Sequence, residues 1–168
     1  MEELSVRELQ AYGAACLARY CAEKGIHSKH VEWLVDHLLL VLVSTRLPVW
    51  ETAGTMFELT GRGEPLPPDL VELIPEGELS RFERLVSCVV KIGMVDMYGG
   101  DTSQSLRSAR ESREVLESAD VKPPSVEDLF PSRQQGAERG WGEPVPGEQY
   151  RHARTWCLRM MKPRPTSV

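Results

Sequence analysis

The chain has 168 residues, of which 41% are hydrophobic and 27% charged, and its formal net charge is -5. This length and balance are typical of one folded domain and argue against a disordered or fibrous chain. The charge is uneven, because residues 148–168 hold five Lys or Arg and one Glu, a net +4, which leaves -9 on residues 1–147. An acidic body argues against nucleic-acid binding through the main domain and favours a basic protein partner.

The first predicted helix covers the segment from Leu4 to Gly25. Ser5 and Glu8 have the spacing of a capping box, in which each side chain accepts a hydrogen bond from the other residue's backbone N–H. Gly25 is a natural left-handed residue at the C-terminal end of a helix. The sequence therefore predicts both ends of this helix.

Further helices follow along the chain. The segment 78–100 carries a second capping-box spacing, Ser80 and Glu83, and is apolar on nearly all sides, so we expect it to form the buried centre together with the second helix. The helix after it has few apolar residues and three Arg–Glu pairs one turn apart, which favours an outer position. The other predicted ranges are 28–44, 48–60, 102–118 and 148–161.

These elements predict an all-α, single-domain helical bundle of about five to six helices, with a long irregular arm before the C-terminal helix. Residues 1–120 would form the bundle core. Residues 121–147 would form a Pro- and Gly-rich arm or linker, since they offer little apolar surface to offset the entropy of ordering. Residues 148–168 would form a basic helix and tail that dock on the same domain.

The four cysteines contain no C-x-x-C pair, and each lies in a helical or apolar pattern, which is typical of reduced, packed thiols. The N-terminus lacks the basic and apolar regions of a signal peptide. The longest apolar run, Leu38–Val43, is too short to cross a bilayer. We therefore expect a cytoplasmic protein that binds no membrane and needs no cofactor.

Three of the four histidines lie in the stretch IHSKHVEWLVDH, Ile26–His37. On a helix His30 and His37 would share a face but lie about 10 Å apart along the axis, so they cannot both bind one zinc ion unaided. We therefore expect no metal site. The alternative is a metal-binding protein or an enzyme that uses His27, His30 and His37 together with Asp96 inside the bundle.

A non-catalytic protein-binding module agrees better with this pattern. Tryptophan side chains are effective anchors in protein interfaces, and carboxylates around them would steer a basic partner. The candidate partner-binding residues lie near the front of the bundle and are Glu32, Trp33, Asp36, His37, Trp50, Glu51 and Glu58. Two further alternatives stay open, a homodimer and a regulatory adaptor whose arm, residues 121–147, orders on a partner.

The stretch IGMVDMYGGDTSQSLRSARE, Ile92–Glu111, joins an apolar helix, a Tyr-Gly-Gly corner and a polar helix. In a short acidic chain this arrangement resembles the small immunity proteins that bacteria make against their own polymorphic toxins. The resemblance assigns no functional residue. It implies an inhibitor that binds a cognate toxin domain tightly, often over the toxin's active site. The acidic body of this chain would suit a basic toxin, and nuclease toxins are usually basic.

Overall fold

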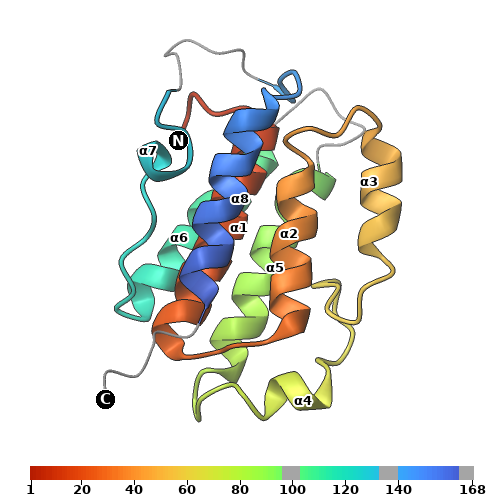
Figure 1. The fold of residues 1–168 in the computed structure, drawn as a ribbon. Helices are drawn as coiled ribbons and strands as arrows, with labels where there is room; N and C mark the ends of the chain where they lie inside the picture. The colour runs from red at the N-terminus through yellow and green to blue at the C-terminus, as the bar shows by residue number, and fades with distance from the viewer. Residues whose placement is uncertain (96–102, 133–139, 163–168) are drawn as a thin grey trace.

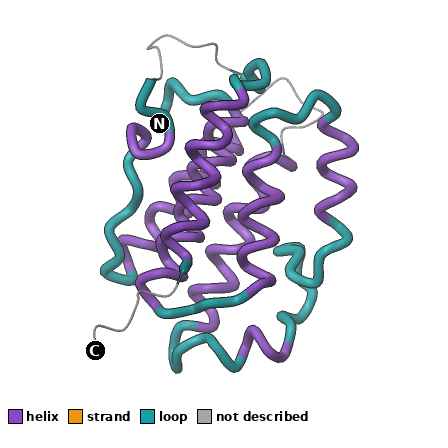
Figure 2. Tube along the Cα trace, in the orientation of Figure 1, coloured by secondary structure: helices purple, strands orange, loops and turns teal. Residues whose placement is uncertain are grey.

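The computed structural model describes residues 1–95, 103–132 and 140–162. Within these ranges every regular element is a helix and none is a strand (Figures 1 and 2). The predicted all-α, single-domain bundle is confirmed. The described residues form more helices than predicted because two of the helices, Pro68–Val71 and Val126–Leu129, have only four residues each. The helices are α1 (Val6–Lys24), α2 (Lys29–Leu40), α3 (Leu47–Gly54), α4 (Pro68–Val71), α5 (Leu79–Val95), α6 (Ser103–Ser118), α7 (Val126–Leu129) and α8 (Gly147–Met161).

The centre of the bundle is α1, and the prediction that α2 and α5 would form it is wrong. Every residue from Val6 to Ala18 is buried, and α1 packs against α2, α5, α6 and α8 (Figure 1). Small side chains on all sides of α1 allow this, because they let the surrounding helices approach closely. At Gly13, for example, a Cβ atom would lie 2.4 Å from Cδ1 of Ile92 on α5.

The predicted ends of α1 are confirmed. The Ser5 hydroxyl accepts a hydrogen bond from the Glu8 N–H, and the Glu8 carboxylate accepts one from the Ser5 N–H at 2.9 Å. Gly25 ends the helix with φ at 70°, in the left-handed region. Local side-chain chemistry therefore sets both ends of the central helix.

Other predicted boundaries differ from the structure. The capping box at Ser80 and Glu83 is wrong, because α5 already begins at Leu79 and the Phe82 N–H donates to the carbonyl of Glu78. The second and third helices end at Leu40 and Gly54, before residues 44 and 60, because the chain turns tighter there through i→i−3 hydrogen bonds.

The sixth helix, α6, has the predicted outer position, since its face with Arg107, Arg110 and Glu114 is exposed. It packs against α1 and α5, and its buried face holds Ser105, Ser108 and Ser112 beside its few apolar residues. Serine is a polar residue, but its small side chain packs closely and its hydroxyl donates to backbone carbonyls, as that of Ser105 does to Ile92 at 2.5 Å. Of the three predicted Arg–Glu pairs the structure shows Arg113–Glu117, at 2.8 Å.

The last part of the chain returns to the bundle. The segment predicted as an irregular arm contains α7, and α8 packs against α1, α2 and α7 (Figure 1). Backbone hydrogen bonds of 2.8 Å join Val6 to Gly140 and Val145 to Leu42. The described residues that lead into α8 therefore lie against the start of α1 and the end of α2.

Candidate functional site

His37 lies in an aromatic stack between α2 and α3. Its imidazole is nearly parallel to the indole of Trp50, with ring centroids 5.3 Å apart, and the ring of Phe57 lies 5.1 Å away. The indole N–H of Trp50 donates to the His37 carbonyl at 2.8 Å. Burial lowers the pKa of His37, and the nearby positive charge of Arg62 lowers it further. Both candidate residues of this stack, His37 and Trp50, are buried and hold α3 on α2.

His30 joins α2 to the segment that follows α3 and to α4. Its Nε2 lies 3.1 Å from both carboxylate oxygens of Asp69, and its Nδ1 lies 3.3 Å from Oε2 of Glu58. The hydrogen bond with His30 lowers the pKa of Asp69. Trp33 presents its ring edge-on to the imidazole, with centroids 6.0 Å apart. His30 is thus a buried polar link beneath exposed acidic and aromatic side chains.

The structure does not bring His27, His30 and His37 together. His27 Nδ1 lies 2.8 Å from the carbonyl of Met161 at the end of α8, whereas His30 and His37 have the separate partners given above. Across residues 1–95, 103–132 and 140–162, no group of three or more His, Cys, Asp or Glu side chains could hold a metal ion. Asp96 lies outside the described residues. The metal-binding alternative therefore gains no support from these histidines.

Besides Glu58, which pairs with His30, two more candidate carboxylates have partners within the chain. Asp36 accepts two hydrogen bonds from the guanidinium of Arg154 on α8, at 2.5 and 3.0 Å. Glu51 pairs with Arg62 at 2.8 Å. Since Trp50 and His37 are buried, the candidates that lie fully on the surface are Glu32, Trp33 and Glu58.

Sequence reasoning missed an open acidic pocket next to Glu58. The pocket has a volume of about 380 Å³ and lies between the segment 58–66 and α5. Its carboxylates come from Glu58, Glu64 and Glu83, and Arg84 is the single basic residue in the described part of its lining. A hydrogen bond from the Thr60 hydroxyl lowers the pKa of Glu64. The pocket therefore carries a net negative charge and favours a cationic group.

Gly61 allows the segment 58–66 to lie close to α5. Its φ is 67°, in the left-handed region, and a Cβ atom there would lie 2.7 Å from Cγ2 of Val90. No sequence motif marks the pocket. Its carboxylates come from the loop that holds Glu58 and Glu64 and from α5, which holds Glu83, and these two segments meet only in the folded chain. The glycine in this loop is the one local signal that a close approach occurs there.

Two exposed apolar side chains are linked to Glu58 of the acidic pocket, one through His30 and one along the chain. Trp33 is 52% exposed and Met56 is 83% exposed. Trp33 is connected to the pocket through His30 and Glu58, and Met56 precedes Glu58 by two residues. The ammonium group of Lys29 lies 5.6 Å from the centroid of the Trp33 ring, so this indole already contacts a cation. We call the surface formed by Trp33, Met56, Glu58, Glu64 and Glu83 the acidic surface.

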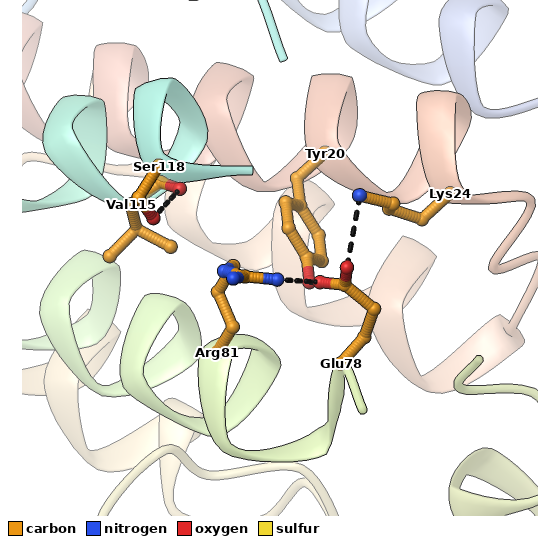
Figure 3. Close-up of polar contacts among 6 residues, drawn as sticks. All are labelled: Tyr20, Lys24, Glu78, Arg81, Val115 and Ser118. Carbon is orange, nitrogen blue, oxygen red and sulfur yellow. Dashed lines mark hydrogen bonds and ion pairs between the residues drawn. The ribbon is translucent and has the colours of Figure 1, made fainter. Parts of the chain in front are cut away.

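Glu78 forms a separate polar cluster between α1 and the start of α5 (Figure 3). Its carboxylate accepts hydrogen bonds from the Tyr20 hydroxyl at 2.5 Å, the Arg81 guanidinium at 2.6 Å and the Lys24 ammonium at 3.0 Å. These donors, the Tyr20 hydroxyl first, lower the pKa of Glu78 to about 2. The carboxylate is therefore ionised and fully occupied by its neighbours at neutral pH, which is the arrangement of a structural ion pair.

The four cysteines are free and buried, so the prediction that they are packed in the core is confirmed. Burial raises the pKa of Cys88 to about 11 and raises those of Cys16, Cys21 and Cys157 further. These thiols stay protonated at neutral pH and are poor nucleophiles.

No protein-family model matches the chain, and no curated protein or solved structure is significantly similar to it. None of the helices in the part of the chain that the structure describes is long and apolar enough to cross a membrane.

Proposed function

We propose that the chain is a protein-binding module whose acidic surface binds a basic region of another protein. The observation that carries this proposal is the acidic pocket, about 380 Å³ in volume, whose Glu58 pairs with His30, the residue that the exposed ring of Trp33 contacts. Met56, two residues before Glu58, is also exposed. A Lys or Arg side chain of the partner would enter the pocket, and apolar groups around it would cover the tryptophan and the methionine. Aromatic anchors next to opposite charges are typical of energetically important interface positions.

We further propose that the module is an immunity-type inhibitor of a toxin or enzyme domain. Two features support this function: the net charge of -9 on residues 1–147 and the resemblance described above. An acidic inhibitor would approach a basic domain rapidly, because opposite charges accelerate association. Nucleic acid would be a poor partner for the same surface, since its phosphates would be repelled by Glu58, Glu64 and Glu83.

A pull-down with the tagged chain tests the first step. The bait would be exposed to the source cell's own lysate at low and at moderate salt, and captured proteins would be identified by mass spectrometry. We expect one stoichiometric basic protein whose capture weakens as salt rises. If the partner has enzymatic activity, the chain should inhibit it at equimolar concentration.

Titration calorimetry with the purified partner tests whether the acidic surface is the binding site. The double variants Glu58→Gln/Glu83→Gln and Trp33→Ser/Met56→Ser should each weaken binding about tenfold or more. The control is Glu114→Gln/Glu127→Gln, which removes two exposed carboxylates from α6 and α7 on the other side of the bundle (Figure 1). Equal affinities for all three variants, or no protein enriched over a mock column, would refute the proposal.

A further inference from the structure

A second pocket lies between α1 and α8, and it differs from the acidic pocket in charge. One face of α8 lines this pocket, because its lining residues follow His152 by three, four, seven and eight positions. Arg19 of α1 completes the lining. The volume of the pocket is about 470 Å³, within the range of small-molecule sites. The opposite face of α8, including Ala153 and Cys157, is buried in the bundle. The residues that line the pocket are Arg19, His152, Thr155, Trp156, Arg159 and Met160.

The pocket is basic. Two guanidinium groups, Arg19 and Arg159, give it a charge of +2, and the imidazole of His152 and the hydroxyl of Thr155 add polar atoms. Among the described residues of its lining none is acidic. His152 Nε2 lies 2.9 Å from the carbonyl of Asp128, which fixes the orientation of the ring. A site of this composition favours an anion, because guanidinium groups match phosphate and carboxylate oxygens in geometry as well as in charge.

Arg19 supplies an independent sign that an acceptor is missing. Its guanidinium carbon lies 5.4 Å from the centroid of the Trp156 ring, which holds the side chain over the indole. Its Nε atom is buried, yet it has no hydrogen-bond partner within the described ranges. A buried donor without an acceptor is costly, and it is the one buried side-chain nitrogen or oxygen atom without a partner in the described structure. The guanidinium of Arg19 therefore lacks part of the hydrogen bonding that its burial requires.

We propose that this pocket binds a phosphate monoester with an apolar or aromatic body. A phosphate monoester carries about −1.5 to −2 at neutral pH, which balances the charge of Arg19 and Arg159. The pocket has room for more than a phosphate group. The apolar body of the ligand would contact Trp156 and Met160, which are both partly buried in the pocket wall. This site is distinct from the acidic surface, and the inference does not depend on the proposed function.

Calorimetric titration of the full chain with three probes at constant ionic strength tests this assignment. Phenyl phosphate should bind saturably with one site per chain, inorganic phosphate more weakly, and benzoate most weakly, because a carboxylate carries one charge. Arg159→Gln should weaken phenyl phosphate binding about tenfold or more. Arg159 is exposed, so this variant should fold like the wild type. Arg19→Gln should weaken binding at least as much, with circular dichroism as the check on folding.

The matched control is Arg151→Gln, which removes the same charge from an exposed position of α8 outside the pocket. Its affinity for phenyl phosphate should stay within twofold of the wild type. Three outcomes would overturn the proposal: no saturable binding of phenyl phosphate up to millimolar concentrations, equal losses in Arg151→Gln and Arg159→Gln, or benzoate binding as tight as that of phenyl phosphate. Equal losses would mean diffuse attraction to a basic helix instead of a site.

Discussion

The side chain of Gln10 on α1 bonds to the backbone of α5 at Gly93 and at Val89. The Gly93 N–H donates to Oε1 of Gln10 at 2.8 Å, and Nε2 of Gln10 donates to the Val89 carbonyl at 2.8 Å. The buried amide of Gln10 therefore links the central helix to α5 through two hydrogen bonds.

Replacing Gln10 by leucine should destabilise the chain by about 1–3 kcal/mol, since it removes two buried hydrogen bonds between α1 and the backbone of α5. Urea unfolding followed by circular dichroism measures the change. The control, Gln104→Leu, makes the same substitution at an exposed position of α6 and should stay within about 0.5 kcal/mol of the wild type. A Gln10→Leu variant as stable as the wild type would show that these two hydrogen bonds add no net stability.

The buried imidazole of His37 predicts a loss of stability in mild acid. Burial lowers the pKa of His37 below its ordinary value of 6.5, so the unfolded chain binds a proton at a higher pH than the folded chain does. The free energy of unfolding should then fall as pH drops below about 6.5, by at most about 1.4 kcal/mol per pH unit from this group.

Phenylalanine at position 37 keeps an aromatic ring against Trp50 but cannot be protonated. Urea unfolding of His37→Phe between pH 7 and pH 5 should therefore show a shallower pH dependence than the wild type. The control His152→Gln, at an exposed position of α8, retains His37 and should keep the wild-type contribution of that group. If His37→Phe has the full wild-type slope, the stack does not cause the pH dependence.

Glu78 predicts a second pH effect, at lower pH. Its pKa falls from 4.5 to about 2 in the folded chain, so its contribution to stability is complete above pH 4.5 and is lost as pH falls from about 4.5 to about 2. At pH 7, Glu78→Gln should destabilise the chain by about 1–2 kcal/mol, a figure that allows for solvent screening of the cluster.

The difference in unfolding free energy between wild type and Glu78→Gln should be smaller at pH 3 than at pH 7. At pH 3 the wild type has already lost part of the stability that the ionised Glu78 contributes. Glu76→Gln changes an exposed carboxylate two residues away and should stay within about 0.5 kcal/mol of the wild type at pH 7. A difference between wild type and Glu78→Gln that grows toward pH 3 would contradict the assigned direction of the pKa.

The ion pair between Asp36 and Arg154 should contribute modestly to the docking of α8. It has two hydrogen bonds, but the side chains of Arg154 and Asp36 are 43% and 34% exposed. A double-mutant cycle of Asp36→Asn and Arg154→Gln should give a coupling of about 0.5–1 kcal/mol at low salt. The coupling should decrease in 1 M NaCl, and a coupling of zero at low salt would show that α8 is held by packing alone.

Much of the fold could be predicted from the sequence because the signals are local. The capping box at Ser5 and Glu8 and the left-handed Gly25 set the ends of α1 through groups that are neighbours along the chain. Helical periodicity and turn residues likewise predicted an all-α bundle and the helical character of the last segment. The capping pattern at Ser80 and Glu83 failed because α5 begins before it, at Leu79.

The candidate site was predicted less well, because periodicity defines the face of a helix but not what covers it. Trp50 is of a residue type that often anchors protein interfaces, yet only 6% of it is exposed because α3 packs it against His37. The same reasoning selected Trp33, and this tryptophan does lie on the surface. The sequence alone offered no means of separating these two tryptophans.

By itself the sequence determined that the chain is helical, where its central helix begins and ends, and that its acidic and basic residues are unevenly distributed. The tertiary structure alone decided which helix is central, because α1 is surrounded through small side chains that have no strong apolar periodicity. It also decided the two pockets, since Glu58 meets Glu83, and Arg19 meets Arg159, only when segments far apart in the chain pack together. Local signals act over one helical turn, whereas a binding site depends on long-range packing.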